Sequence, residues 1–136
     1  MNASIAFAID CGGDIRIGGQ AGLARPVRVD DPLGRGCLHE FELVSGGVAT
    51  SGIGRRSWLD AEGRPAHHLL DPSTGRPAYT GILQATALAH TAVEAEMLAK
   101  AALLSGPRGA HRWLRHGGLL VFEDGSHVVH DGELAA

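Results

Sequence analysis

The sequence predicts an α+β fold: a mainly antiparallel sheet with helices packed on one side. Three observations indicate it. Short β-type runs and glycine-rich turns fill the first ninety residues, a capped helix rich in alanine and leucine follows, and a hairpin ends the chain. A chain of 136 residues can bury one core but not two. We therefore expect a single domain over residues 1–136.

Several of the early apolar runs alternate with polar residues. Arg28 separates Val27 from Val29, and glutamates flank Phe41 on both sides. A period of two is typical of strands with one buried face. We expect strands at residues 4–10, 14–17, 26–29, 39–44, 47–50 and 81–89, with a further short run at 58–59 and a turn at 60–63.

The predicted main helix begins after Thr91, because threonine at the N-cap and Glu94 three residues later fit a capping box. Good helix formers continue to residue 104, and Gly106-Pro107 is a stop signal. A second short helix is expected at 108–116. Asp-Gly between the apolar runs 119–122 and 127–130 predicts the closing hairpin.

The segment from His68 to Gly75 carries the most chemistry in few residues. Asp71-Pro72 is a strong turn starter, and Gly75 suits a left-handed turn position. This predicts a rigid corner that holds His68 at the end of an incoming strand. A histidine positioned there could act as a general base. A turn with a purely structural role would have the same sequence. The neighbouring His67 should point the other way and be exposed.

Residues 68–77 read His-Leu-Leu-Asp-Pro-Ser-Thr-Gly-Arg-Pro, and this segment resembles the signature of the ApbE family, the FAD:protein FMN transferases. That signature is His, two hydrophobic residues, Asp-Pro-x-Thr-Gly-x-Pro, and every fixed position matches. Three further segments follow the family order: Gly12-Gly13-Asp14, residues 48–52, and the helix with Glu96. The resemblance spans nearly the whole chain but only the C-terminal half of the family's usual length.

The resemblance implies an α+β fold and Mg²⁺-dependent transfer of FMN from FAD to a threonine of a target flavoprotein, with release of AMP. His68 matches the family's catalytic base. Leu70 matches a position that contacts the flavin nucleotide through its backbone, and Asp71 and Thr74 hold the corner and are candidates for contacting the ligand. Gly13 and Asp14 match the Gly-Gly-Asp turn near the flavin pocket.

The metal site implied by the resemblance falls on Glu96 and Lys100. The family places an aspartate and, four residues later, a small oxygen donor on one helix face, where both can reach one Mg²⁺. Here the second position is lysine, whose ammonium group cannot ligate a cation. Two other interpretations stay open: an ordinary helix-surface ion pair, or a lysine that neutralises the diphosphate in place of the metal.

Composition excludes several classes of function. A formal net charge of −3 gives no electrostatic footprint for nucleic acid, and no apolar run is long enough to span a membrane. The first residues lack the basic and apolar regions of a signal peptide, which favours a cytoplasmic location. Two cysteines, Cys11 and Cys37, are too few for a disulfide framework. Four later histidines show no ligand spacing: His111, His116, His127 and His130.

Three functions remain open for a chain that matches the C-terminal half of the family. It could be a transferase completed by another chain or segment, a non-catalytic module that binds flavin or a partner, or an inactive remnant. The expected partners are FAD and the acceptor flavoprotein. Faces that the remainder of the family domain would cover also make a homodimer plausible.

Overall fold

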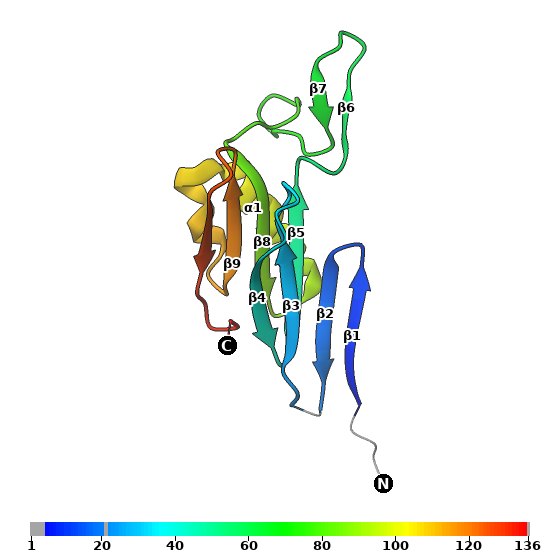
Figure 1. Cartoon of the computed structure of the whole chain (residues 1–136), viewed down its shortest axis with the longest axis vertical. Helices are drawn as coiled ribbons and strands as arrows, with labels where there is room; N and C mark the ends of the chain where they lie inside the picture. The colour runs from blue at the N-terminus through cyan, green and yellow to red at the C-terminus, as the bar shows by residue number, and fades with distance from the viewer. Residues whose placement is uncertain (1–4, 21, 136) are drawn as a thin grey trace.

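A six-stranded antiparallel sheet forms the centre of the protein, with the strand order β1-β2-β5-β8-β9-β10 (Figure 1). The computed structural model describes residues 5–20 and 22–135. The six strands are Ala6–Cys11 (β1), Asp14–Gly19 (β2), Gly46–Gly52 (β5), Ile82–Ala89 (β8), Gly118–Phe122 (β9) and His127–His130 (β10). Two separate hairpins pair Arg25–Asp30 (β3) with Cys37–Leu43 (β4), and Ser57–Leu59 (β6) with Pro65–His67 (β7).

The strands predicted from periodicity are all present, with shifts of a few residues at their ends. Ser4, the first residue of the first predicted strand, lies outside the described residues. The Gly12-Gly13 turn between β1 and β2 has positive φ at both positions, +69° and +102°. This is the combination that a tight two-residue hairpin requires, and it explains the paired glycines.

Helix α1 (Ala92–Gly109) begins as its sequence predicts, because the Thr91 side chain accepts a hydrogen bond from the Glu94 amide. Gly106 adopts a φ of +71° and breaks the helix before Pro107. The second helix was predicted to end at His116, which is wrong: it closes as the 3-10 turn Ala110–Trp113 (η1). Gly117 has a φ of +112° and bonds back to Leu114, so the chain turns there instead.

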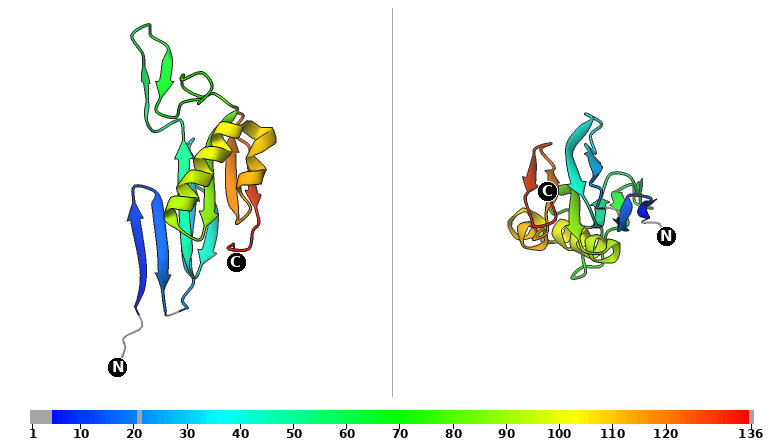
Figure 2. Two further views of the ribbon diagram at one scale, coloured as in Figure 1. Left: turned by 180° about the vertical axis from the view of Figure 1, so that it is seen from behind. Right: turned by 90° about the horizontal axis from the view of Figure 1, so that it is seen from below.

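The two faces of the sheet are covered by different layers, as the end-on view in Figure 2 shows. Helix α1 packs its alanines and leucines on small residues of β5 and β8, which confirms the predicted helical layer on one side. The β3–β4 hairpin covers part of the opposite face with Val27, Val29, Phe41 and Leu43. Periodicity identified these two strands but not their position over the sheet. Among the described residues, no helix is both long and apolar enough to cross a membrane.

The start of α1 lies very close to strand β5. A Cβ atom added to Gly47 would lie 2.4 Å from the carbonyl carbon of Thr91 and 2.5 Å from the amide nitrogen of Ala92. Both neighbours are backbone atoms that cannot swing aside. A residue without a side chain at position 47 therefore allows the helix to begin where it does, and this start sets the positions of Glu96 and Lys100.

Replacing Gly47 with alanine should destabilise the fold, because the new methyl group would push the helix off the sheet. We expect Gly47→Ala to lower the free energy of unfolding by about 1–3 kcal/mol, the usual cost of overpacking. Urea denaturation measures this loss. Gly54→Ala is the matched control: its Cβ would meet nothing within 4 Å, so stability should change by less than about 1 kcal/mol. Equal midpoints for the two variants would contradict the close approach.

Candidate functional site

The corner after β7 is held by its own side chains. One carboxylate oxygen of Asp71 accepts hydrogen bonds from the amide (2.8 Å) and the hydroxyl (2.6 Å) of Ser73. Those two bonds hold the pKa of the Asp71 carboxyl below its usual value, the hydroxyl having the larger effect. The Thr74 hydroxyl accepts from the amide of Arg76 at 3.2 Å, and Gly75 has a φ of +69°. The predicted rigid turn is therefore present.

His67, predicted to be exposed, is instead almost fully buried. Its Nδ1 accepts a hydrogen bond from the Leu69 amide at 3.2 Å, and its Nε2 lies 2.8 Å from the carbonyl oxygen of Ala78. The ring also packs edge-on against Tyr79. His67 and His68 do face opposite ways, but His67 is the one that faces inward, because its ring nitrogens bond to both arms of the corner. His67 fastens the two arms of the corner together, and His68 is left exposed.

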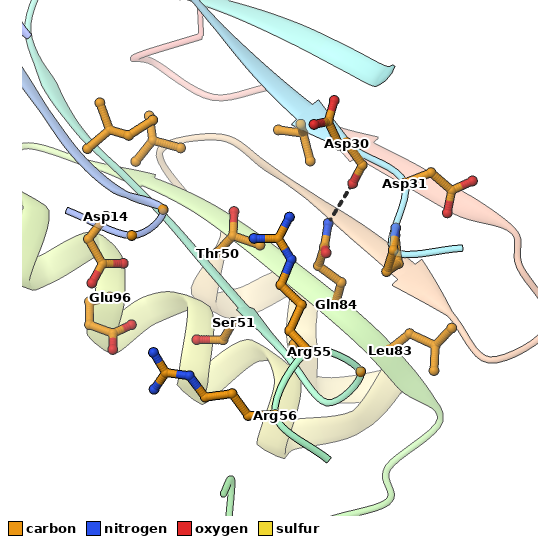
Figure 3. Close-up of a pocket in the computed structure, with 18 of the residues that line it drawn as sticks. Asp14, Asp30, Asp31, Thr50, Ser51, Arg55, Arg56, Leu83, Gln84 and Glu96 are labelled. Carbon is orange, nitrogen blue, oxygen red and sulfur yellow. Dashed lines mark hydrogen bonds between the residues drawn. The ribbon is translucent and has the colours of Figure 1, made fainter. Parts of the chain in front are cut away.

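A pocket of about 650 Å³ lies beside this corner, between the sheet, the β3–β4 hairpin and α1 (Figure 3). Five residues predicted for the site line it, although they come from three separate parts of the chain: Gly13, Asp14, His68, Glu96 and Lys100. Leu70, Asp71 and Thr74 are not among the lining residues. Leu70 is half exposed, and the other two stabilise the turn.

The acidic end of the pocket joins the β1–β2 turn to helix α1. Asp14 and Glu96 lie next to each other in Figure 3. Burial raises the pKa of the Asp14 carboxyl, and repulsion from Glu96 adds to this, while Lys100 opposes it. Lys100 forms an ion pair with Glu96 one helical turn away. Two carboxyl groups and one ammonium group therefore share this corner of the pocket.

This donor set does not fit Mg²⁺ as it is arranged. Mg²⁺ requires near-octahedral coordination by oxygen, and Asp14 and Glu96 could supply two carboxylates. The ammonium group of Lys100, however, already forms an ion pair with Glu96 and would repel a second cation. The alternative in which lysine supplies the positive charge is compatible with these contacts.

Another part of the pocket wall is polar and includes two arginines. Thr50 and Ser51 on β5 and Arg55 and Arg56 just after it line the wall. The hydroxyl groups of Thr50 and Thr86 lie 2.8 Å apart. These groups could bind the phosphate oxygens of a nucleotide.

Sequence reasoning missed the part of the wall that β3 contributes. Asp30 and Arg28 reach the pocket only because the hairpin docks over the sheet. The amide group of Gln84 on β8 donates a hydrogen bond of 3.1 Å to the Asp30 carbonyl, which links the hairpin to the sheet. No motif or spacing relates these residues along the chain, so only the tertiary arrangement identifies them.

Known proteins resemble this chain in both sequence and fold. It is 29% identical over 131 residues to the FAD:protein FMN transferase of Klebsiella pneumoniae (strain 342), covering 93% of this chain and 36% of that protein. The crystal structure of the ApbE protein from Thermotoga maritima superposes with a TM-score of 0.77 at 32% identity, covering 94% of this chain and 43% of that one.

A flavinyl transferase of Pseudomonas stutzeri shares the fold at 22% identity, with a TM-score of 0.70 over 96% of this chain and 43% of that one. The chain thus spans about a third of the length of the Klebsiella relative and less than half of the solved structures. A sequence profile of the ApbE family matches residues 3–122. With that match over most of its length, this chain belongs to the ApbE family.

Proposed function

We propose that this chain forms the histidine-bearing part of an FAD:protein FMN transferase. The observation that carries the proposal is that one pocket is lined by five residues: His68, Gly13, Asp14, Glu96 and Lys100. These are residues that the family resemblance singles out, and they are far apart in sequence. The names of the relatives support the same activity.

The proposed reaction transfers a phosphoryl-linked group. The hydroxyl oxygen of a threonine on the target flavoprotein attacks the phosphorus of the FMN part of FAD. The bond between that phosphorus and the bridging oxygen of the diphosphate breaks, and AMP leaves with that oxygen. His68 accepts the threonine proton. Transfers of this kind depend mainly on positioning and charge neutralisation, with modest help from the base.

Positive groups of this chain are proposed to neutralise the diphosphate. Lys100 lies beside Asp14 and Glu96, and Arg55 and Arg56 also line the pocket. The family resemblance implies Mg²⁺, but the lysine on Glu96 makes a second cation unfavourable there. We therefore propose that the ammonium group of Lys100 supplies the positive charge that Mg²⁺ would otherwise supply. Whether the activity depends on Mg²⁺ is then a property to measure.

A non-catalytic flavin-binding module is the second candidate, and Lys100 is the observation that favours it. Replacing a metal ligand with an ammonium group could preserve binding while removing turnover. An inactive remnant is the third. If the chain is part of a transferase, a second chain or a further segment would complete the pocket. Strand β1 offers an edge for this, since Ile9 and Phe7 are exposed on it.

We expect His68→Ala to separate binding from transfer. FAD affinity, followed by flavin fluorescence, should change only a few-fold, because His68 is exposed and acts on the acceptor. The rate of AMP release in the presence of an acceptor flavoprotein should fall by about 10²–10⁴-fold, the usual contribution of a general base. His111→Ala, at an exposed histidine outside the pocket, is the matched control and should keep the wild-type rate.

The wild-type chain distinguishes the three candidates in the same assays. AMP release supports the transferase. FAD binding without any AMP release contradicts a transferase that is active as this chain alone and favours the non-catalytic module. A folded chain that binds no FAD contradicts a complete flavin pocket in this chain and favours the remnant.

Lys100→Thr tests the source of the neutralising charge. Loss of a charge-assisted contact to the diphosphate should weaken FAD binding in the absence of metal by about 10–100-fold. Removing the ammonium group should also free Asp14 and Glu96 to bind Mg²⁺, so added Mg²⁺ should restore affinity. Lys100→Arg keeps the charge and should retain most of it. Unchanged FAD affinity and unchanged metal dependence in Lys100→Thr would contradict the role given to Lys100.

Asp14→Asn should make the chain more stable at neutral pH. The pKa of Asp14 is raised in the folded state by burial and by Glu96, so the ionised carboxylate opposes folding above that pKa. The amide removes this cost, by less than about 1 kcal/mol because the group is partly solvated. Near pH 3 the carboxyl is protonated in both states, and the gain should vanish. Urea midpoints at the two pH values, with exposed Asp131→Asn as the control, measure the difference.

A further inference from the structure

Two histidines and a glutamate meet at a place that the pocket does not include. His90 follows β8, His116 follows η1, and Glu133 belongs to the segment after β10. One carboxylate oxygen of Glu133 lies 2.6 Å from Nδ1 of His116 and 3.3 Å from Nε2 of His90. The ligand atoms of all three residues fall within 4.8 Å of one another. Three segments distant in sequence thus direct nitrogen and oxygen donors to one point.

We propose that His90, His116 and Glu133 form a Zn²⁺ site. Two imidazoles and one carboxylate, with water in the fourth position, are an established tetrahedral zinc ligand set. Zinc bonds of about 2.0–2.1 Å place neighbouring ligand atoms about 3.3 Å apart. The His90–Glu133 distance already has this value. The site needs a wider His116–Glu133 contact and a closer approach of the two imidazoles, whose ligand atoms lie up to 4.8 Å apart, and the exposed Glu133 and His90 side chains can rotate to provide both.

A carboxylate behind His116 supports this assignment. Oxygen Oε1 of Glu94, in the first turn of α1, lies 3.5 Å from Nε2 of His116, the ring nitrogen that faces away from Glu133. A histidine that ligates a metal through one nitrogen usually gives the proton on the other to a carboxylate. Arg115 donates to the same Glu94 oxygen at 3.2 Å and keeps it in place. Glu94 is therefore a positioning residue for the site.

The hydrogen bonds of His116 show which proton zinc binding would displace. Nε2 of His116 accepts a hydrogen bond from Arg115 at 3.1 Å, so its Nδ1 carries the proton shared with Glu133. Zinc binding would require the other tautomer of His116: Nδ1 gives up its proton, Nε2 takes one up from water and loses the Arg115 hydrogen bond, and Nε2–H can then donate to Glu94. Zinc would then join the C-terminal segment to β8 and to η1. Without zinc, the same residues make only hydrogen bonds and partly exposed ion pairs, which contribute little to stability.

The test is calorimetric titration of the whole chain with ZnCl₂, using protein that lacks a polyhistidine tag and has been stripped with a chelator. We expect one equivalent to bind and a higher midpoint of thermal unfolding, because a ligand that prefers the folded state stabilises it. Co²⁺ in place of Zn²⁺ should give the visible absorption of a tetrahedral site. The absence of stoichiometric binding overturns the proposal.

Substitutions of exposed side chains distinguish zinc ligands from residues that do not bind zinc, without disturbing the fold. His90→Ala and Glu133→Gln should each weaken zinc binding by more than about 100-fold, beyond the roughly 10–100-fold loss that a supporting residue causes. Glu94→Gln should fall within that smaller range. His127→Ala, at another exposed histidine, should bind as the wild type does. Binding that survives both ligand substitutions unchanged overturns the proposal.

Discussion

The contact between α1 and the small residues of β5 and β8 positions the rest of the molecule. Alanines on the helix meet alanines on the two strands, and Gly47 removes the last side chain that would keep them apart. The helix axis therefore lies close to the sheet, and residues on its flank reach the edge of β2. Glu96 and Lys100 meet Asp14 only because of that approach. The electrostatics of the pocket thus follow from packing between small side chains.

Local rules predicted much of this fold and part of the site. The N-cap at Thr91, the paired glycines before Asp14 and the turn built on Asp71 each depend on a few neighbouring residues, and each is present as expected. The family resemblance then assigned roles that spacing alone left open. His68, Asp14 and Glu96 do come together, which the order of motifs along the chain could only suggest.

Other features depend on long-range packing and could not be predicted locally. His67 is buried because two arms of a loop close over it, whereas alternation says only that His67 and His68 face opposite ways. Asp30 reaches the pocket because one hairpin docks over the sheet. The cluster of His90, His116 and Glu133 escaped detection for the same reason, since its members are spaced too irregularly to suggest a ligand motif. Each case requires knowing which distant segments are neighbours.

The corner that bears His68 is part of a long excursion between two adjacent central strands. β5 ends at Gly52 and β8 begins at Ile82, yet the two are hydrogen-bonded along their length. The β6–β7 hairpin extends away from the sheet within this connection (Figure 1). Because the entropy of closing a loop rises only logarithmically, doubling its length costs about 0.6 kcal/mol. Evolution can therefore lengthen or reshape this excursion, and with it the surface beside His68, while the sheet beneath keeps its pairing.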